Sequence, residues 1–334
     1  MLVNVGKLMS HTSTKGGGGV KHPFNPSLVD AWFMSGLSNS DKPTQIVGVK
    51  KNKLQLKNFA YALNSGFGEY ATDFNSWSEA SGGAEFTRTS ESVHITNVIS
   101  QARFLYKSSN ITLKIKVSGT TDNLYPSIKY GDIWLDCKTD GIYSIENTDN
   151  KEINFVVRSG IGSCNITITQ LPTAYEGALV FDGVDDYGIC TGLPILDDYT
   201  VICRRIILNK PYFYYTVASK SKVANEGAFI LEIIQDQIYN HCHSFGANNR
   251  IGLHNGEISW QTKNSYNGNT IKAGDRKDSD HLFIGRLRDT TNGFCLQGVI
   301  YYFALYNKSL TPEEVEEEKV KLENYWEGGK NELA

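Results

Sequence analysis

The sequence contains no long hydrophobic run and carries little net charge. No window approaches the roughly 18 consecutive apolar residues of a transmembrane helix, and the first residues, Met-Leu-Val-Asn-Val-Gly-Lys-Leu-Met, lack the apolar stretch of a secretion signal. The formal charge is only −3, from 33 basic and 36 acidic side chains that are scattered along the chain. We therefore expect no membrane and no nucleic acid as partners, and we expect synthesis in a reducing cytoplasm.

Cysteine and proline are scarce as well. The 6 cysteines include no C-x-x-C pair that would indicate a zinc or redox site, so we expect buried free thiols. The cysteines are Cys137, Cys164, Cys190, Cys203, Cys242 and Cys295. Against 8 prolines stand 31 glycines, 18 tyrosines and 15 phenylalanines, a composition typical of short strands joined by tight turns. A chain of 334 residues is long enough for one large or two medium β domains.

Strand patterns run from Leu28 to about Asn307, as short alternating or β-branched runs closed by Gly, Asn and Asp. In residues 111–117, apolar Ile, Leu and Val alternate with Thr and Lys, which buries one face of a strand and leaves the other in water. This alternation favours an antiparallel sandwich over a parallel sheet. The expected strands are Lys53–Phe59, Ser92–Val98, Thr112–Val117, Gly131–Leu135, Ile153–Val157, Asn165–Gln170, Tyr199–Ile207, Gly227–Ile233, His281–Gly285 and Gly298–Tyr306.

The two ends of the chain differ from this pattern. Residues 1–25 are polar and include four consecutive glycines at 16–19, which favours a flexible N-terminal attachment segment. At the other end, Thr-Pro-Glu-Glu at 311–314 supplies an N-cap, a first-turn proline and a capping-box glutamate, so a helix begins here and runs to about Trp326. Its apolar repeat is short. The helix either rests on the sandwich with a solvated face or forms a subunit contact.

Three separated segments resemble the LamG-like family of concanavalin A-like jelly rolls. Leu28–Gly36, Leu-Val-Asp-Ala-Trp-Phe-Met-Ser-Gly, resembles the family's opening strand. Ala178–Tyr187, Ala-Leu-Val-Phe-Asp-Gly-Val-Asp-Asp-Tyr, is similar to its Phe-Asp-Gly-x-Asp-Asp-Tyr signature. Leu282–Gly285 and Gly298–Val315 resemble the closing strands and the cap of the terminal helix.

The resemblance implies an all-β fold, an antiparallel concanavalin A-like jelly-roll sandwich with a short C-terminal helix. In this chain the first two segments begin 150 residues apart, at Leu28 and Ala178, against a few dozen residues in the family. We therefore expect a second, smaller inserted β-sandwich domain at residues 66–172. The jelly roll is then discontinuous, over 26–65 and 173–310, and residues 311–334 hold the helix and tail.

The tryptophan-containing opening, the inserted module and the Leu-Tyr-Asn-Lys-x-Leu-Thr ending look most like proteins of tailed phages and prophages of gut bacteria. This resemblance implies a non-enzymatic virion structural protein, a head or tail fibre or a decoration, whose lectin-like domain serves host attachment by binding surface glycans. It implies location in the virion, other virion proteins as partners through the N-terminal segment, and a homo-oligomer. The alternative is a free bacterial surface lectin or adhesin, and an enzyme is the third interpretation.

LamG-like domains often carry calcium at the rim of the sandwich. The resemblance therefore makes Asp182, Asp185 and Asp186 candidate calcium ligands, and no other cofactor is expected. The competing interpretation is a turn, in which Gly183 adopts a positive φ and the Asp182 side chain caps backbone amides.

Glycan binding requires exposed aromatic rings among polar neighbours, because sugar faces stack on rings while hydroxyl groups take directional hydrogen bonds. Two segments have this mixture, and they make Tyr212, Trp260 and Tyr266 candidate ligand-binding residues. The alternative is that these rings belong to strands and pack in the core.

No catalytic residue is predicted, because the sequence lacks the Glu-x-Asp-x-Glu pattern of jelly-roll glycosidases. The nearest carboxylate pairs, Glu232 with Asp236 and Asp132 with Asp136, are isolated spacings that solvated strand ends explain. His241-Cys242-His243 would place both imidazoles on one face of a strand, where a third ligand such as His254 or His281 would complete a metal site. Simple packing is the competing interpretation of these histidines.

Overall fold

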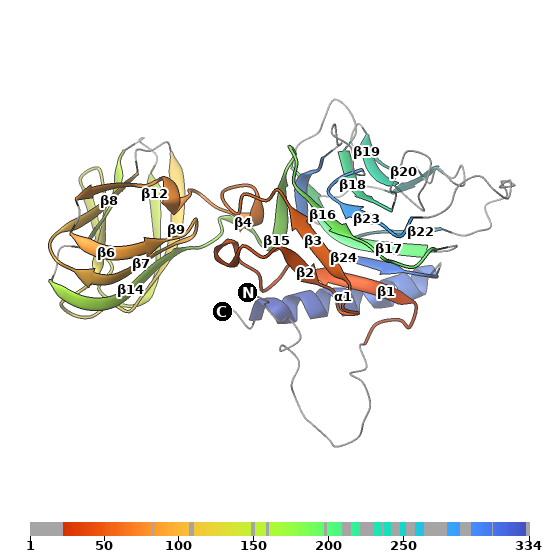
Figure 1. The fold of residues 1–334 in the computed structure, drawn as a ribbon, viewed down its shortest axis with the longest axis horizontal. Helices are drawn as coiled ribbons and strands as arrows, with labels where there is room; N and C mark the ends of the chain where they lie inside the picture. The colour runs from red at the N-terminus through yellow and green to blue at the C-terminus, as the bar shows by residue number, and fades with distance from the viewer. Residues whose placement is uncertain are drawn as a thin grey trace, which may run out of the picture. The chain divides into compact units, whose positions relative to one another are not determined.

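A computed structural model (Figure 1) describes most of the chain. The described ranges are 23–81, 83–106, 110–147, 151–157, 160–196, 199–208, 215–220, 230–234, 237–241, 248–251, 258–263, 279–287, 295–308 and 310–331, with the backbone alone for the four ranges between 230 and 263. No helix in these ranges is long and apolar enough to span a membrane.

The chain folds as two compact units. The first comprises residues 1–37, 43–60 and 177–334, and the second comprises 38–42 and 61–176. The second unit therefore interrupts the first, with its main division at 60/61 and 176/177. The sequence predicts limits of 66–172 for the inserted domain, within the observed 61–176.

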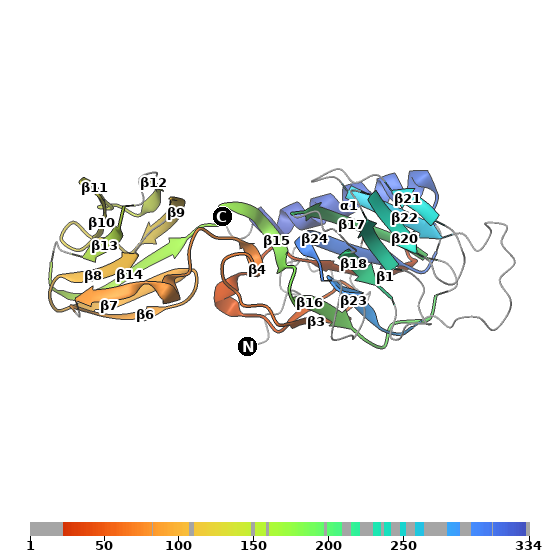
Figure 2. The same ribbon diagram turned by 90° about the horizontal axis from the view of Figure 1, so that it is seen from above.

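Two antiparallel sheets make the first unit a β-sandwich (Figures 1 and 2). One sheet has the strand order β22-β17-β24-β15, with β1 also paired to β24, and the other has the order β2-β3-β16-β23-β18-β19-β20-β21. The strands of the first sheet are β1 (Leu28–Phe33), β15 (Ala174–Asp182), β17 (Tyr199–Ile207), β22 (Ile258–Lys263) and β24 (Gln297–Tyr306). Those of the second are β2 (Gln45–Val47), β3 (Lys53–Lys57), β16 (Tyr187–Cys190), β18 (Tyr215–Ser219), β19 (Ile230–Ile234), β20 (Gln237–His241), β21 (Asn248–Ile251) and β23 (Leu282–Ile284). The expected all-β class is confirmed.

The segments that lie far apart in the sequence meet on β24. Along one side this strand pairs with β17, from Thr200 opposite Tyr306 to Ile207 opposite Gly298. Along its other side, β1 pairs with residues 302–306 and β15 pairs with residues 297–300. The segments that begin at Leu28 and Ala178 are therefore neighbours of one strand in one sheet, as the sequence predicted.

A β-bulge in β24 places Tyr301 and Tyr302 on the same side. Tyr302 pairs with Arg204 and Ile300 pairs with Arg205, so Tyr301 is the extra residue. The Tyr301 ring packs edge-on against Trp326 with centroids 5.2 Å apart, and the Tyr302 hydroxyl donates to Glu323 over 2.7 Å. The alternation of side chains between the two faces of β24 is therefore interrupted at Tyr301.

Helix α1 (Pro312–Asn331) covers the outer face of β24 (Figure 2). The predicted apolar repeat is its buried face, formed by Val315, Leu322 and Trp326. The Tyr306 hydroxyl donates to Glu318 over 3.0 Å, and Arg204 pairs with Glu323 over 2.8 Å. The helix ends five residues beyond the expected Trp326, and it rests on the sandwich as the first of the two interpretations had it.

A buried carboxylate fixes the loop after β2. Asp30 is fully buried, and its two oxygens accept four hydrogen bonds of 2.8 Å each. The donors are the backbone amides of Ala31, Lys50 and Asn52 and the side-chain amide of Asn52. Burial raises the pKa of Asp30 above its ordinary value, although the hydrogen bonds act in the opposite direction. The Asp30 carboxylate therefore accepts backbone hydrogen bonds from Lys50 and Asn52, two loop residues that lie outside the strands.

The second unit is a smaller sandwich of two five-stranded antiparallel sheets, with orders β11-β10-β13-β8-β5 and β12-β9-β14-β7-β6. The first contains β5 (Ser78–Ser81), β8 (Ala102–Tyr106), β10 (Pro126–Tyr130), β11 (Ile133–Asp136) and β13 (Ile153–Val157). The second contains β6 (Ala84–Arg88), β7 (Ser92–Val98), β9 (Ile111–Ser118), β12 (Gly141–Asn147) and β14 (Gly162–Gln170). Their inner faces enclose a core of aliphatic and aromatic side chains, among them Phe74, Trp77 and Phe155. The short strand β4 (Gly66–Glu69) pairs with β15.

Most expected strands are present, with ends that differ by up to three residues. Ser92–Val98, Ile153–Val157 and Tyr199–Ile207 are observed with the expected bounds. The strand expected at Gly131–Leu135 is wrong at its start, because Gly131 and Asp132 form the turn of a hairpin between β10 and β11. Gly131 has a φ of +56°, which a hairpin turn requires and a strand does not.

Two short helical turns complete the described elements. One spans Asn39–Asp41, and the other spans Phe74–Ser76, where the Asp73 side chain accepts a hydrogen bond from the Asn75 amide. The first belongs to the second unit although it lies between β1 and β2 in the sequence. The contacts that hold it come from Glu91, which is 4% exposed.

The first unit begins before the expected limit of the N-terminal attachment segment. The Phe24 side chain is buried against Phe33 and Tyr325, and the Asn25 amide donates to Glu318 over 3.0 Å. Residues 1–22, the rest of that segment, lie outside the described residues. The five cysteines in the described ranges are free, and all are buried except Cys164, for which the expectation of burial is wrong.

Candidate functional site

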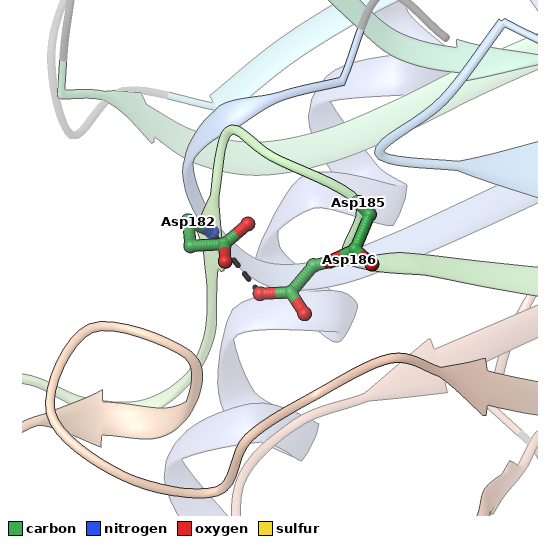
Figure 3. A group of neighbouring side chains, drawn as sticks. All are labelled: Asp182, Asp185 and Asp186. Carbon is green, nitrogen blue, oxygen red and sulfur yellow. Dashed lines mark hydrogen bonds between the residues drawn. The ribbon is translucent and has the colours of Figure 1, made fainter. Parts of the chain in front are cut away.

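The three candidate calcium ligands lie together in the turn between β15 and β16 (Figure 3). Gly183 has a φ of +83°, and the Val184 amide donates to Asp182 Oδ1 over 2.8 Å. The Asp182 amide donates to Asp186 Oδ2 over 3.1 Å. The sequence expectation of a positive φ at Gly183 and a capping Asp182 is therefore confirmed.

The arrangement of the aspartates also fits a calcium ion. Ligand oxygens of Asp182, Asp185 and Asp186 all lie within 4.8 Å of one another. Calcium binds oxygen at about 2.3–2.6 Å, so two ligands on opposite sides of the ion are about 4.6–5.2 Å apart. In the part of the chain that the structure describes, this is the one group of three or more acidic, histidine or cysteine side chains close enough to share a metal. Asp182 and Asp186 serve the turn as well, since a carboxylate oxygen has more than one acceptor position.

Beside this turn, an aromatic row lies on the outer face of the second sheet. Gly188 faces the sandwich core, because a Cβ at this position would lie 2.9 Å from the buried Leu54 side chain. Side chains alternate along a strand, so Tyr187 points to the other face, as does Phe283, which pairs opposite Ile189. The rings of Tyr187 and Phe283 have centroids 6.2 Å apart, and because Phe283 is 1% exposed, only the half-buried Tyr187 offers ring surface.

A cation and a histidine border the same row. The Arg286 guanidinium lies 4.7 Å from the centroid of the Tyr187 ring, and His281 stacks against Phe283 with centroids 6.4 Å apart. Asp280 Oδ1 lies 2.6 Å from His281 Nδ1, so the structure pairs this histidine with a carboxylate. The face therefore combines ring surface, a guanidinium donor and carboxylate acceptors.

Charges of both signs act on the buried thiol of Cys295, which lies close to the turn. Burial raises the pKa of Cys295 most, Arg286 lowers it, and the three aspartates of the turn raise it. Arg286 thus partly offsets the effect of the three aspartates on the pKa of Cys295. Cys295 stays a protonated thiol at neutral pH, and we assign it no chemical role.

Replacing Gly183 by alanine tests how tightly this turn is built. The added Cβ lies 2.8 Å from the Gln297 Cβ in a left-handed backbone conformation, so we expect G183A to lower the free energy of unfolding by about 2 kcal/mol. G192A is the matched control, because Gly192 has a φ of +76° but no atom within 4 Å of the added Cβ. Urea denaturation measures both variants, and equal losses would show that the contact with Gln297 costs nothing.

The candidate glycan-binding residues are not brought together by the described structure. Tyr212 and Tyr266 lie outside the described residues. Trp260 lies in β22 opposite Ile202, and only its backbone is described. Nothing in the structure therefore assigns a role to these three side chains.

Of the alternative catalytic and metal candidates other than His281, the structure describes the side chains of Asp132 and Asp136. Asp136 Oδ1 accepts a hydrogen bond from Ser127 Oγ over 2.7 Å, and Asp132 is exposed in the turn of the β10–β11 hairpin. Glu232 and His241 lie in β19 and β20, where only the backbone is described. The others, Asp236, Cys242, His243 and His254, lie outside the described residues.

The sequence analysis missed a second group of exposed aromatic and charged side chains, on the β10–β11 hairpin. Trp134 is 38% exposed, whereas Trp32, Trp77 and Trp326 are all at most 3% exposed. The signal was present in the sequence as a Gly-Asp pair between two alternating runs, which is a two-residue hairpin pattern.

Comparisons with known proteins leave the chain without an assigned family. No protein-family model and no curated protein matches the sequence. Among solved structures, the full extracellular region of zebrafish Gpr126/Adgrg6 matches 66% of this chain at 10% identity and a TM-score of 0.29, and the match covers 35% of the zebrafish chain. Trypanosoma rangeli sialidase in complex with the inhibitor DANA matches 81% of this chain at 9% identity and a TM-score of 0.32, over 67% of its own length. This chain therefore spans about a third of the zebrafish protein and two thirds of the sialidase. TM-scores this low carry no argument, and the β-sandwich assignment stands on the strand pairing above.

Proposed function

We propose that this chain is a non-enzymatic structural protein of a tailed-phage virion. In this proposal it is a head or tail fibre or a decoration, its first unit is a LamG-like domain of the concanavalin A-like type, and it binds host-surface glycans. The alternative is a free bacterial surface lectin or adhesin, which would need an export route.

One observation carries this proposal. The three sequence segments that resemble the LamG-like family contribute β1, β15 and β24, and β1 and β15 both pair with β24 in a single sheet. The other part of the third segment, Leu282–Gly285, contributes β23 to the second sheet. A coincidental match of three short segments has no reason to place them side by side. The resemblance to phage proteins depends on the same segments and on the inserted sandwich between them.

The outer face next to the aspartate turn supports the glycan-binding part of the proposal. Tyr187 offers ring surface, Arg286 offers donors, and Asp182 and Asp185 offer acceptors that are only partly buried. Sugars need this combination, because their apolar faces stack on rings and their hydroxyl groups both donate and accept.

The test of the virion assignment is co-purification with particles. Phage particles from a lysate of the producing strain are banded on a density gradient and analysed by mass spectrometry. We expect peptides of this chain in the particle band, and we expect deletion of residues 1–22 to remove it from the band without unfolding the rest. Absence of the full-length chain from the band contradicts the proposal, and a processed N-terminus in the cell-envelope fraction favours the adhesin. Release of reducing ends from host polysaccharides, lost in E232Q or D236N, would make the protein an enzyme.

Calcium titration tests the expected cation at the turn. If calcium binds, its addition at about 100 times the dissociation constant stabilises the first unit by about 2.7 kcal/mol. D185N is the informative variant, because Asp182 and Asp186 accept the backbone hydrogen bonds of the turn and stay in place. We expect calcium to raise the melting temperature of the wild type and to raise that of D185N less. A wild type whose melting temperature does not respond to calcium excludes the ion from this turn.

A further inference from the structure

The β10–β11 hairpin of the second unit presents three cross-strand pairs on one face. Lys129 pairs with Trp134 and Ser127 pairs with Asp136 in the strand register. The pairing continues one position further, since the Cys137 amide donates to the Pro126 carbonyl over 2.9 Å. Alternate residues of a strand share a face, so the next pair on this face is Tyr125 with Lys138.

Side-chain contacts confirm that these six residues form one strip. Lys129 Nζ lies 5.4 Å from the centroid of the Trp134 ring, and Lys138 Nζ lies 5.7 Å from that of the Tyr125 ring. Between these two cation–π pairs, Ser127 Oγ donates to Asp136 Oδ1 over 2.7 Å. We call residues 125, 127, 129, 134, 136 and 138 the hairpin strip.

The hairpin strip lies on the outer face of its sheet. Ile128 and Leu135, which alternate with the strip residues, face the core of the second unit, and Ile128 is fully buried there. Lys138 is exposed, and Trp134 is 38% exposed. In the described sheet β11 is the edge strand, so Lys129 on β10 approaches the Trp134 ring from the interior side of the sheet. On the other side of the ring, no described strand pairs with β11.

Trp134 presents part of its ring to solvent, and Lys129 lies against that ring. Two rings stand at opposite ends of the strip. Trp134 lies in β11 and Lys138 lies two residues past its end, so the two are four residues apart, or about 13 Å if the extended rise of about 3.3 Å per residue continues. Between the rings lie a lysine at each end and, in the middle, the hydroxyl–carboxylate pair, of which Ser127 is fully buried and Asp136 is half-buried and offers the acceptor. The strip therefore alternates ring surface with donors and acceptors.

We propose that the hairpin strip is a binding platform for an oligosaccharide. The Trp134 and Tyr125 rings stack on two sugar units of one chain, and Lys129, Lys138 and Asp136 bond to the hydroxyl groups between them. The span between the rings selects an oligosaccharide over a single sugar. The charged pairs that separate the rings disfavour an apolar protein surface as the occupant, because each charge would lose its water on docking. The inference does not depend on the virion assignment, because it uses only residues of the second unit.

Glycan-array binding of the full-length protein tests this inference. The array carries capsular, teichoic-acid and lipopolysaccharide glycans of gut bacteria together with plant and fungal polysaccharides. We expect the wild type to bind at least one class of oligosaccharide, W134A to lose at least about tenfold in affinity for it, and Y125A to lose less. I142A is the matched control, since Ile142 is 59% exposed on an edge strand of the other sheet of the same unit.

The outcomes separate the hairpin strip from other sites and occupants. Circular dichroism and thermal melting must show W134A folded as the wild type, and the gentler W134F, which keeps a ring, should retain most of the binding. A wild type that binds no glycan on the array overturns the inference, as does equal binding by wild type and W134A. Loss of binding in Y187A but not in W134A assigns the glycan to the first unit and equally overturns it. A change in oligomeric state in W134A, measured by light scattering, would make the strip a contact between copies. W134A should still be incorporated into phage particles. If the hairpin strip binds no glycan, the proposal that the chain is a virion protein is therefore unaffected.

Discussion

Substituting Asp30 by asparagine should destabilise the first unit nearly as much as substituting it by alanine. Both carboxylate oxygens of Asp30 accept hydrogen bonds, Oδ1 from Ala31 and Lys50 and Oδ2 twice from Asn52. D30N must place its NH2 group against the backbone amides of Ala31 and Lys50 or against that of Asn52, and those amides lose their acceptor even if the Asn52 side chain turns its oxygen toward the NH2 group. We expect a loss of roughly 3–5 kcal/mol for D30A and only slightly less for D30N, because buried donors left without an acceptor cost about 1–3 kcal/mol each.

Hydrogen exchange followed by mass spectrometry measures this effect in the first unit alone. Peptides that cover residues 45–57 should lose protection in both variants, because Lys50 and Asn52 are fixed by the Asp30 carboxylate. D122N is the control, since Asp122 is exposed in the second unit and its change should cost under about 0.5 kcal/mol. If D30N proves as stable as the wild type, the carboxylate does not hold the loop.

The fold class and the position of many strands followed from local sequence patterns. Alternation in residues 111–117 marked β9, and Phe-Asp-Gly after an apolar run marked the end of β15, since each feature depends on neighbours in the chain. The bulge at Tyr301 could not be predicted in this way. It arises because residues 302–306 pair with β1 while residues 297–300 pair with β15, and no property of β24 alone reveals where one partner replaces the other.

The candidate sites likewise differ in whether their residues are close together in the sequence or far apart. Asp182, Asp185 and Asp186 are close in sequence, so a tight turn was enough to bring them together. Arg286 joins Tyr187 from the segment just after β23, about 100 residues away in the sequence, and such a contact follows from sheet order rather than from spacing. The hairpin strip was local and could have been predicted, had Gly131 and Asp132 been assigned to a turn.

The segment Ser38–Lys42 belongs to the second unit although it is separate from the rest of that unit in the sequence. It lies between two jelly-roll strands in the sequence, yet its contacts belong to the second unit. Asn39 is fully buried and its side chain accepts a hydrogen bond from the Phe67 amide, while its own amide donates to Glu91 Oε1 over 2.6 Å. A single glutamate therefore connects pieces of chain that are about 50 residues apart.

Glu91 should respond to amide substitution in the opposite way from Asp30. Oε1 accepts from the Asn39 amide and the Tyr70 hydroxyl, while Oε2 accepts from the Ser40 hydroxyl over 2.7 Å. In E91Q the retained oxygen keeps the first two bonds and the new NH2 donates to Ser40, whose hydroxyl can rotate to accept. We therefore expect a loss of roughly 3 kcal/mol for E91A and under about 1 kcal/mol for E91Q.

The measurement is again hydrogen exchange, read in peptides that cover residues 38–42 and 66–70. E91A should expose the Asn39 and Phe67 amides to exchange, because both depend on the position that Glu91 gives to Asn39. E85A is the control, since Glu85 is exposed on β6. Equal losses in E91A and E91Q would mean that the negative charge, rather than acceptor geometry, holds Ser38–Lys42. The opposite responses of the two buried carboxylates thus follow from their donors alone: rigid amides around both oxygens of Asp30, and a rotatable hydroxyl on one oxygen of Glu91.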